Sequence, residues 1–414
     1  MQPVASALRA RAAAQWAALP ARLRLPVSVA AAVLLAALLL ALLRSGGGPA
    51  LSTAARDAAA DALFRRATVS HVLGAPVCPV DAGGGAGGGG GGCGGALAFL
   101  RYTPAPLEEE WAARAPDFAG RECAQIASEA PLWQAQLDGV AAGGGAGAAW
   151  SVATYRDAAS GAEVSVALEP LAGVMRDPRP ICEKELRLKP RAAERGLDSR
   201  DFTLLDAAFY FSVAAQLAAP AATAAAAAGA PAAAPAAAPA QRPRALLFDL
   251  GATRWDPAHV TGFRWTVEAY ARLGIHFDEI FAWEALPVKT LDFFGPMPLL
   301  LAARTHLFNV PVARPGVGGV ADALAMLREA ARPQDFVVFK LDIDHDVLEE
   351  EIALALLQDD ALAARVDDFY FEHHADTHGV MSPYWGVNLR RTLHESVLLF
   401  QAFRKRGIRA HSWP

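Results

Sequence analysis

Phe336-Val-Val-Phe-Lys-Leu-Asp-Ile-Asp344 is the stretch of sequence that decides the fold. It is a short apolar run that ends in acidic residues, and the last 170 or so residues contain three more runs of this kind, at 245–252, 279–285 and 366–374. Continuous apolar runs of this length are typical of strands buried on both faces, which occur almost only in parallel sheets covered by helices. Ligands bind such sheets outside the carboxyl ends of the strands, where these polar residues stand.

Helical patterns alternate with the apolar runs. They cover residues 263–273, 319–331, 348–357 and 393–406, and residues 408–413 can form a final strand. This alternation predicts an α/β fold with a Rossmann-like, doubly wound sheet over residues 244–414. Asp346, with Glu349 three residues later, predicts a capping box at the start of one helix.

Composition divides the rest of the chain. We expect, in order, a cytosolic tail (1–24), a transmembrane signal anchor (25–43), a stalk (44–66), an α+β extension (67–215) and an Ala/Pro-rich linker (216–243). Low-complexity glycine tracts at 83–95 and 143–147 interrupt the extension. Between them, alternating patterns predict short strands at 97–102, 150–155 and 163–168, and a helix follows residue 202.

The anchor assignment rests on length and charge. As a helix, the uncharged run 25–43 spans about 28 Å, close to the roughly 30 Å hydrocarbon core of a bilayer. Four arginines precede it and fewer follow, which places the N-terminus in the cytosol. We therefore expect a single-pass type II membrane protein of the Golgi or endoplasmic reticulum lumen. Acid-poor, Arg-rich N-termini are also typical of transit peptides, so a chloroplast or mitochondrial location is the alternative.

Charge and cysteine content narrow the classes of partner and compartment. The net charge of −5 and the absence of a Lys/Arg block predict no nucleic-acid partner. Four cysteines follow the anchor, at positions 78, 93, 123 and 182. An even number in a lumenal segment fits two disulfides in any of three connectivities, and four unpaired thiols are the alternative.

The ends of the first two strands indicate a nucleoside site. In Phe248-Asp-Leu-Gly-Ala252, Gly251 gives the backbone the freedom for a tight turn and for close approach of a ligand. The second strand ends at Glu284, the position at which α/β nucleotide-binding proteins hold ribose hydroxyls with a carboxylate. The dinucleotide pattern G-x-G-x-x-G is absent.

The third and fourth strands end in groups suited to proton transfer or metal binding. Period-two alternation places Lys340, Asp342 and Asp344 on one face or at the mouth of the sheet. The fourth strand ends at Glu372 and His373, followed by a second histidine. Carboxylate and imidazole groups can accept a proton near neutral pH or ligate a metal.

In this order, the motifs FDLGA, AWEA, FVVFKLDID and DDFYFEHH resemble S-adenosylmethionine-dependent methyltransferases of the FkbM-like group. The resemblance covers roughly residues 245–413 and implies a methyltransferase-like sheet with S-adenosyl-L-methionine as cofactor. It implies that the methionine part is lined by Asp249, Gly251 and Ala252, that Glu284 holds the ribose, and that the reaction centre is faced by Lys340, Asp342 and Asp344.

On this interpretation the chain is a membrane-anchored methyltransferase-like enzyme that methylates oxygen on a sugar or another small acceptor. The candidate bases are Asp342, Glu372 and His373, and the class needs no metal. Two alternatives remain open. A Golgi-type glycosyltransferase would use Asp342-x-Asp344 to hold a divalent metal on a sugar nucleotide. An inactive protein would keep the methyltransferase fold without turnover.

Overall fold

The computed structural model describes residues 97–118, 121, 124–125, 128–129, 150–157, 160–171, 203–219, 242–376 and 389–413. The expected anchor, stalk and cysteines, and most of the Ala/Pro-rich linker, lie outside these residues. Within the described ranges, none of the helices combines the length and the apolar character needed to span a bilayer.

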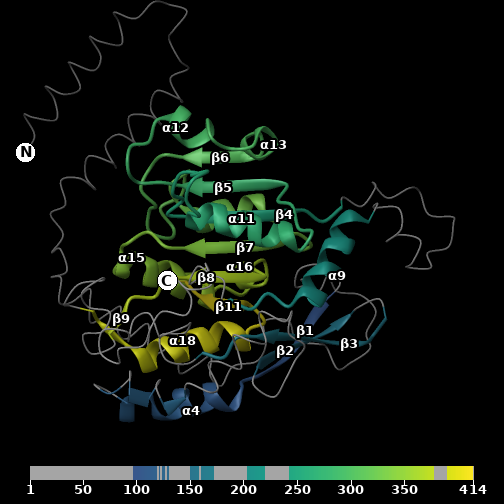
Figure 1. Ribbon diagram of the computed structural model, residues 1–414, viewed down its shortest axis with the longest axis vertical. Coiled ribbons are helices and arrows are strands. Elements are labelled where there is room, and N and C mark those ends of the chain that lie inside the picture. Colours follow the sequence, from purple (N-terminus) through teal and green to yellow (C-terminus); the bar gives the residue numbers. More distant parts are fainter. Residues whose placement is uncertain are drawn as a thin grey trace, which may run out of the picture. The chain divides into compact units, whose positions relative to one another are not determined.

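A six-stranded sheet forms the centre of the fold, in the order β11-β8-β7-β4-β5-β6 (Figure 1). Every neighbouring pair in it is parallel. The strands are β4 (Ala245–Leu250), β5 (Glu279–Trp283), β6 (Thr305–Phe308), β7 (Phe336–Leu341), β8 (Asp368–Phe371) and β11 (Arg409–Ser412). The predicted α/β sheet is confirmed, and its strand order is that of doubly wound nucleotide-binding folds. The sequence analysis did not anticipate β6.

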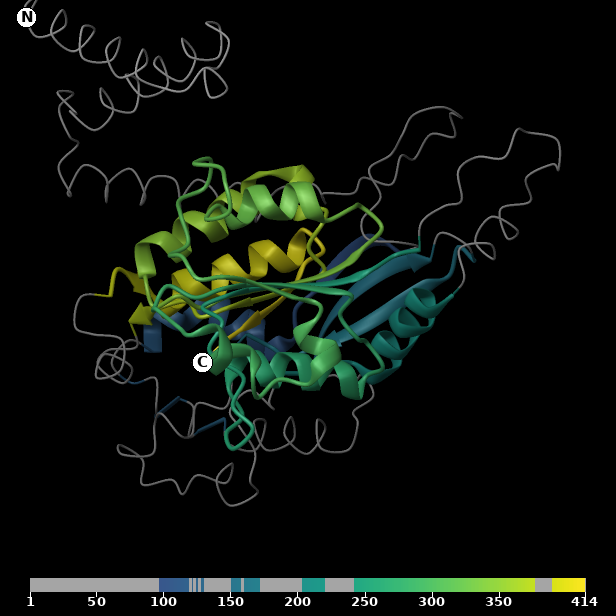
Figure 2. The ribbon, with the colours of Figure 1, turned by 90° about the horizontal axis from the view of Figure 1, so that it is seen from above.

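Helices cover both faces of the sheet (Figure 2). One face carries α14 (Ala323–Ala330), α15 (Asp346–Gln358) and α18 (Leu393–Lys405), and the other carries α9 (Ala207–Ala218) and α11 (Gly262–Arg272). Shorter elements complete the α/β part: α12 (Thr290–Phe294), α13 (Leu299–Ala302), α16 (Asp360–Ala363), β9 (Ala375–Asp376) and β10 (Arg391–Thr392). Along the chain the predicted helices thus alternate with the strands, and in space they cover the two faces of the sheet, as in a doubly wound fold.

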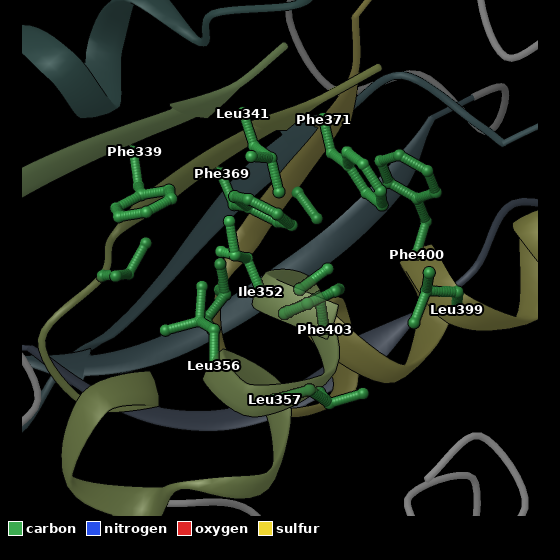
Figure 3. Close-up of a cluster of buried hydrophobic side chains, with 14 of the residues drawn as sticks. Phe339, Leu341, Ile352, Leu356, Leu357, Phe369, Phe371, Leu399, Phe400 and Phe403 are labelled. Atoms are coloured by element: carbon green, nitrogen blue, oxygen red, sulfur yellow. The ribbon is translucent and has the colours of Figure 1, made fainter. Parts of the chain in front are cut away.

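Strand alternation builds the core. On β7, Phe339 and Leu341 face α15 and α18, where Ile352 and Phe403 pack against them, and Phe369 of β8 joins them (Figure 3). All five side chains are at most 1% exposed, and burying such a side chain contributes about 1.5–3 kcal/mol. On β4, β7 and β8 the side chains of this face are apolar. The chemistry therefore lies on the other face and at the strand ends.

The extension contributes a three-stranded antiparallel sheet. Its elements are β1 (Leu97–Thr103), β2 (Ser151–Asp157) and β3 (Glu163–Leu168), with α4 (Pro106–Arg114) and η2 (Ala115–Phe118) after β1. The three strands confirm the prediction from alternation. Phe99 and Tyr155 belong to the same buried cluster as Phe336 of the main sheet, so the extension and the α/β sheet share a hydrophobic core.

A buried group of charges, here called the anchor cluster, joins the two sheets. It consists of Glu108, Glu169, Arg404 and His411. The guanidinium of Arg404 lies 3.2 Å from a carboxylate oxygen of Glu108 and 3.2 Å from one of Glu169, while His411 Nδ1 lies 2.8 Å from Glu169. Arg404 and His411 are at most 1% exposed. Every carboxylate in this cluster has a basic partner.

The predicted capping box of α15 is wrong by one residue. His345, and not Asp346, is the N-cap, and its ring nitrogen accepts the amide of Leu348. Glu349 does not bond back to the cap. Its Oε1 instead accepts the amide of Ile343 at 2.6 Å, which turns this side chain toward the end of β7.

Candidate active site at the carboxyl ends of the strands

The turn after β4 packs closely against the end of β7 and forms hydrogen bonds with the end of β5. Gly251 has φ +85°, and a Cβ built there would lie 1.5 Å from the carbonyl oxygen of Asp342, so only glycine fits. The amides of Gly251 and Ala252 both donate to the carbonyl of Trp283. Helix α11 begins only at Gly262, and its amides therefore do not follow the turn directly. Ala252 is fully buried.

A buried lysine stands at the point where the strand order reverses. Lys340 Nζ lies 3.1 Å from Asp249 Oδ1 and 2.9 Å from Asp342 Oδ2. Trp413 covers the group, since its Nε1 donates to Asp342 at 2.8 Å and its ring lies 5.2 Å from the lysine nitrogen. Alternation brings Asp249 and Lys340 to the face that α11 covers, away from the apolar face of Figure 3.

Charge and burial set the protonation of this group in opposite directions. Burial alone would lower the pKa of Lys340, but Asp249 and Asp342 raise it, so the ammonium persists. Burial raises the pKa of Asp249, although Lys340 opposes the shift. No described residue forms a hydrogen bond with Asp249 Oδ2. Burial also opposes ionisation of Asp342, yet Lys340 lowers its pKa overall. Asp342 is therefore held as a carboxylate, engaged by an ammonium and an indole.

Glu284 lies at the tip of β5, beside the Gly251 turn. Its side chain is half-buried, its Oε1 accepts the amide of Leu286 at 2.7 Å, and its charge contributes to the raised pKa of Asp249. Asn309 donates to the Glu284 carbonyl at 2.8 Å and so fixes the backbone. The carboxylate keeps accepting capacity for a ligand at the ends of β4 and β5.

An open groove of roughly 510 Å³ lies next to these strand ends. The loop after β4 forms one wall and helix α12, which follows β5, forms the other. The lining residues are Arg254, Trp255, Asp256, Pro257, Leu291, Asp292, Gly295 and Pro296. Small-molecule sites commonly have volumes of about 300–1,000 Å³. The groove lining combines one arginine and two aspartates with apolar and aromatic side chains, and the Arg254 guanidinium lies 4.0 Å from Asp256.

A second polar group, here called the acidic cluster, lies at the ends of β7 and β8. It consists of Asp344, Glu349, Glu372 and His374. His374 Nε2 lies 3.2 Å from Glu372 Oε2, and one donor atom from each of Asp344, Glu372 and His374 lies within 4.8 Å of the other two. Asp344 has φ +55° and is exposed, whereas Glu349 is 1% exposed and its Oε2 has no hydrogen-bond partner among the described residues.

The acidic cluster adjoins Asp342. Burial, together with the Asp342 charge, raises the pKa of Glu372, although the hydrogen bond with His374 opposes the shift. Burial raises the pKa of Glu349 to about 7. The pKa of His374 is raised because Glu372 and Glu349, despite the burial of the ring, favour the imidazolium. These carboxylates sit where proton transfer near neutral pH is attainable.

His373 lies apart from both groups. Alternation turns it to the opposite face, where its Nδ1 lies 2.8 Å from the hydroxyl of Ser396 on α18 and its ring packs on Phe371. Burial lowers the pKa of His373 to about 3, so the ring is neutral at neutral pH. Of the predicted bases, the structure brings Asp342 and Glu372 together and places His373 elsewhere.

Three residues of the candidate site, His374, Glu349 and Trp413, were not among the site residues predicted from the sequence. His374 shares a face with Glu372 because the two are two residues apart, and period two applied to the end of β8 would have selected it over His373. Glu349 was assigned to capping, and Trp413 carries no local signal. Comparisons of the chain with protein-family models, with curated proteins and with solved structures found no match.

Proposed function

We propose that this chain is a methyltransferase-like enzyme that uses S-adenosyl-L-methionine and methylates a hydroxyl of a sugar or another small acceptor. The observation that carries the proposal is the groove beside the ends of β4 and β5, together with Glu284 at the tip of β5. In a doubly wound sheet a nucleoside binds outside these two strand ends, and a carboxylate on the second strand accepts hydrogen bonds from both ribose hydroxyls.

Each residue then has a distinct task. Glu284 holds the ribose, and Arg254 in the groove wall offers a cation to the carboxylate of the methionine part. Gly251 keeps the turn narrow enough for β4 and β7 to stay paired. Catalysis is mainly by proximity, because the acceptor hydroxyl must lie in line with the sulfonium methyl group.

The proton of the acceptor goes to Glu372 in this scheme. Its pKa is raised by burial and by Asp342, which makes it a stronger base than an exposed glutamate. Asp342 is fixed by Lys340 and Trp413, so its charge is held in place beside Glu372. For the glycosyltransferase alternative, the engagement of Asp342 by Lys340 means that Asp342 and Asp344 are not presented together as a free chelating pair.

A second candidate is a protein that keeps the sheet without turnover. The observation that favours it is burial at the strand-order reversal: Asp249 and Lys340 are at most 1% exposed and Trp413 is 3% exposed. A cofactor that must touch Asp249 would have to displace Trp413.

Calorimetric titration of the full chain tests the proposal. The ligands are S-adenosylmethionine, S-adenosylhomocysteine, and a uridine or guanosine diphosphate sugar with Mn²⁺. We expect the first two to bind and Glu284→Ala to weaken them at least tenfold, about 1.4 kcal/mol. The matched control is Glu279→Ala, at the opposite end of β5, which should bind like the parent.

Each other outcome has a defined meaning. Equal binding by the parent and Glu284→Ala removes the ribose assignment. Absence of binding by either methionine derivative overturns the proposal, and binding of only the sugar nucleotide with metal selects the glycosyltransferase. Binding of S-adenosylmethionine without methyl transfer to any hydroxyl acceptor supports the second candidate.

A further inference from the structure

We infer that the acidic cluster is a binding site for a divalent transition-metal ion of the Mn²⁺ type. The proposed ligands are Asp344, Glu372 and His374. Glu349 is a buried neighbour that supports the site without being a ligand. The inference rests on the position of these side chains and does not depend on the proposed methyl transfer.

The donor atoms already lie at near-ligating separations. Ligands that bind one ion at about 2.0–2.2 Å lie at most about 4.3 Å apart. Here the three donors lie within 4.8 Å of one another, so small side-chain rotations bring them onto one ion. His374 Nε2 and Glu372 Oε2 now face each other at 3.2 Å, and an ion between them would replace their direct contact.

Glu349 provides an independent reason to expect a cation. It is 1% exposed, and its Oε2 has no hydrogen-bond partner in the part of the chain that the structure describes. A buried carboxylate oxygen without a partner is costly, and such groups are normally paired or coordinate metals. Glu349 interacts electrostatically with His374 and Glu372, so it lies near the proposed site. Three carboxylates thus gather around one imidazole, and a divalent ion would offset their charge.

Nearby cations have other partners. Lys340 is held by Asp249 and Asp342. Arg391 forms a buried ion pair with Glu350, and Arg390 lies 3.3 Å from the same glutamate. Glu350 on α15 is thus paired with two arginines, whereas Glu349, on the same helix, has no arginine partner among the described residues.

The donor chemistry selects the class of ion. Two carboxylates and one imidazole suit metals that accept both oxygen and nitrogen, whereas thiolate-rich sites favour softer ions. Asp344 is exposed, so the ion can enter from solvent and keep open positions there. Three protein ligands with open positions are typical of catalytic rather than structural sites. Those positions can take water or acceptor oxygens beside Glu372.

The test is a titration of the full chain with Mn²⁺ in the absence of any nucleoside. Binding is monitored by the decrease in the electron paramagnetic resonance signal of free Mn²⁺. We expect one ion per chain. His374→Ala and Asp344→Asn should each weaken binding at least tenfold, and Glu349→Gln by roughly 10- to 100-fold, as expected for a supporting group. Asparagine tolerates the positive φ of position 344, so this variant should keep its backbone.

The matched controls are His306→Ala and Glu351→Gln. His306 also faces a glutamate, Glu279, at 3.5 Å, and Glu351 lies on the same helix as Glu349 but pairs with Arg314. Both controls should bind Mn²⁺ like the parent. The inference is overturned if the parent does not bind Mn²⁺ at about 1 mM, the weak limit of functional calcium sites. It is also overturned if the donor variants bind as the controls do. Neither result bears on S-adenosylmethionine binding.

Discussion

Two buried glutamates, Glu108 in the anchor cluster and Glu349 in the acidic cluster, show how differently this protein treats buried charge. Both stand in the first turn of a helix and are at most 1% exposed. Glu108 accepts hydrogen bonds from five groups: Tyr102, Ser151, the amide of Leu171, Gln401 and Arg404. Within the described ranges, Glu349 accepts one hydrogen bond, from Ile343, and its other oxygen has no partner there.

The difference separates a structural site from a binding site. The carboxylates of the anchor cluster are satisfied within the chain, because each of them meets a basic group. The acidic cluster carries more carboxylates than cations and opens to solvent at Asp344. Burial alone therefore does not mark function here. The two clusters differ in whether their buried carboxylates pair with arginines of the same chain.

Breaking the anchor cluster should have the largest effect. Arg404→Leu leaves Glu108 and Glu169 buried without their arginine, and removing one partner of a buried ion pair costs about 3–5 kcal/mol. The measurement is the free energy of unfolding from a urea titration. Arg328→Ala is the control, since Arg328 and Asp359 form an exposed pair worth at most about 1 kcal/mol. Equal midpoints for these two variants would contradict a structural role for the cluster.

Sequence patterns predicted the parts of the fold that depend on local periodicity. Apolar runs located β4, β5, β7 and β8, because strands buried on both faces need continuous apolar side chains. The four-residue β6 was missed since a run so short gives no clear period. The sequence also gave no sign that the extension shares a core with the sheet, because Phe99 and Phe336 are distant in the chain and meet only in the fold.

For the candidate site too, the sequence predicted which residues lie at the strand ends but not which of them contact one another. Position at a strand end selected Asp249, Glu284, Asp342 and Glu372, and the structure places all of them at or next to the carboxyl ends of strands. Pairing was not predictable. The contact of Lys340 with Asp249 and the cover formed by Trp413 depend on strand order and on the return of the chain after β11, which no local pattern encodes.

The same substitution at the two glutamates should act in opposite directions. Glu349→Gln removes a buried charge that is poorly solvated, so we expect the metal-free protein to gain about 1–3 kcal/mol at pH 8. Glu108→Gln places an amide NH₂ among five donors, and the unsatisfied groups should cost about 1–3 kcal/mol. Both are read from urea unfolding with a chelator present. A loss of stability in Glu349→Gln would mean that this carboxylate is already satisfied.

The smallest effect concerns the response of the anchor cluster to acid. Although burial opposes it, His411 and Arg404 lower the pKa of Glu169 below its usual value. A carboxyl whose pKa is lower in the folded than in the unfolded state stabilises the fold above the unfolded pKa of about 4.3, and this contribution is lost as the pH falls through the folded value. The parent should therefore lose more stability than Glu169→Gln as the pH falls from about 5 to 3, the range in which such carboxylates titrate.

This comparison isolates Glu169 from the other acids, because they titrate in both proteins. Glu169→Gln is less stable than the parent at neutral pH, since Arg404 and His411 lose a charged partner. The gap between the two proteins should narrow as the pH falls, because protonation removes the same charge from the parent. A gap that stays constant from pH 5 to 3 would show that Glu169 titrates alike in both states. In that case the anchor cluster and the acidic cluster would differ only in the hydrogen bonds that their buried carboxylates accept.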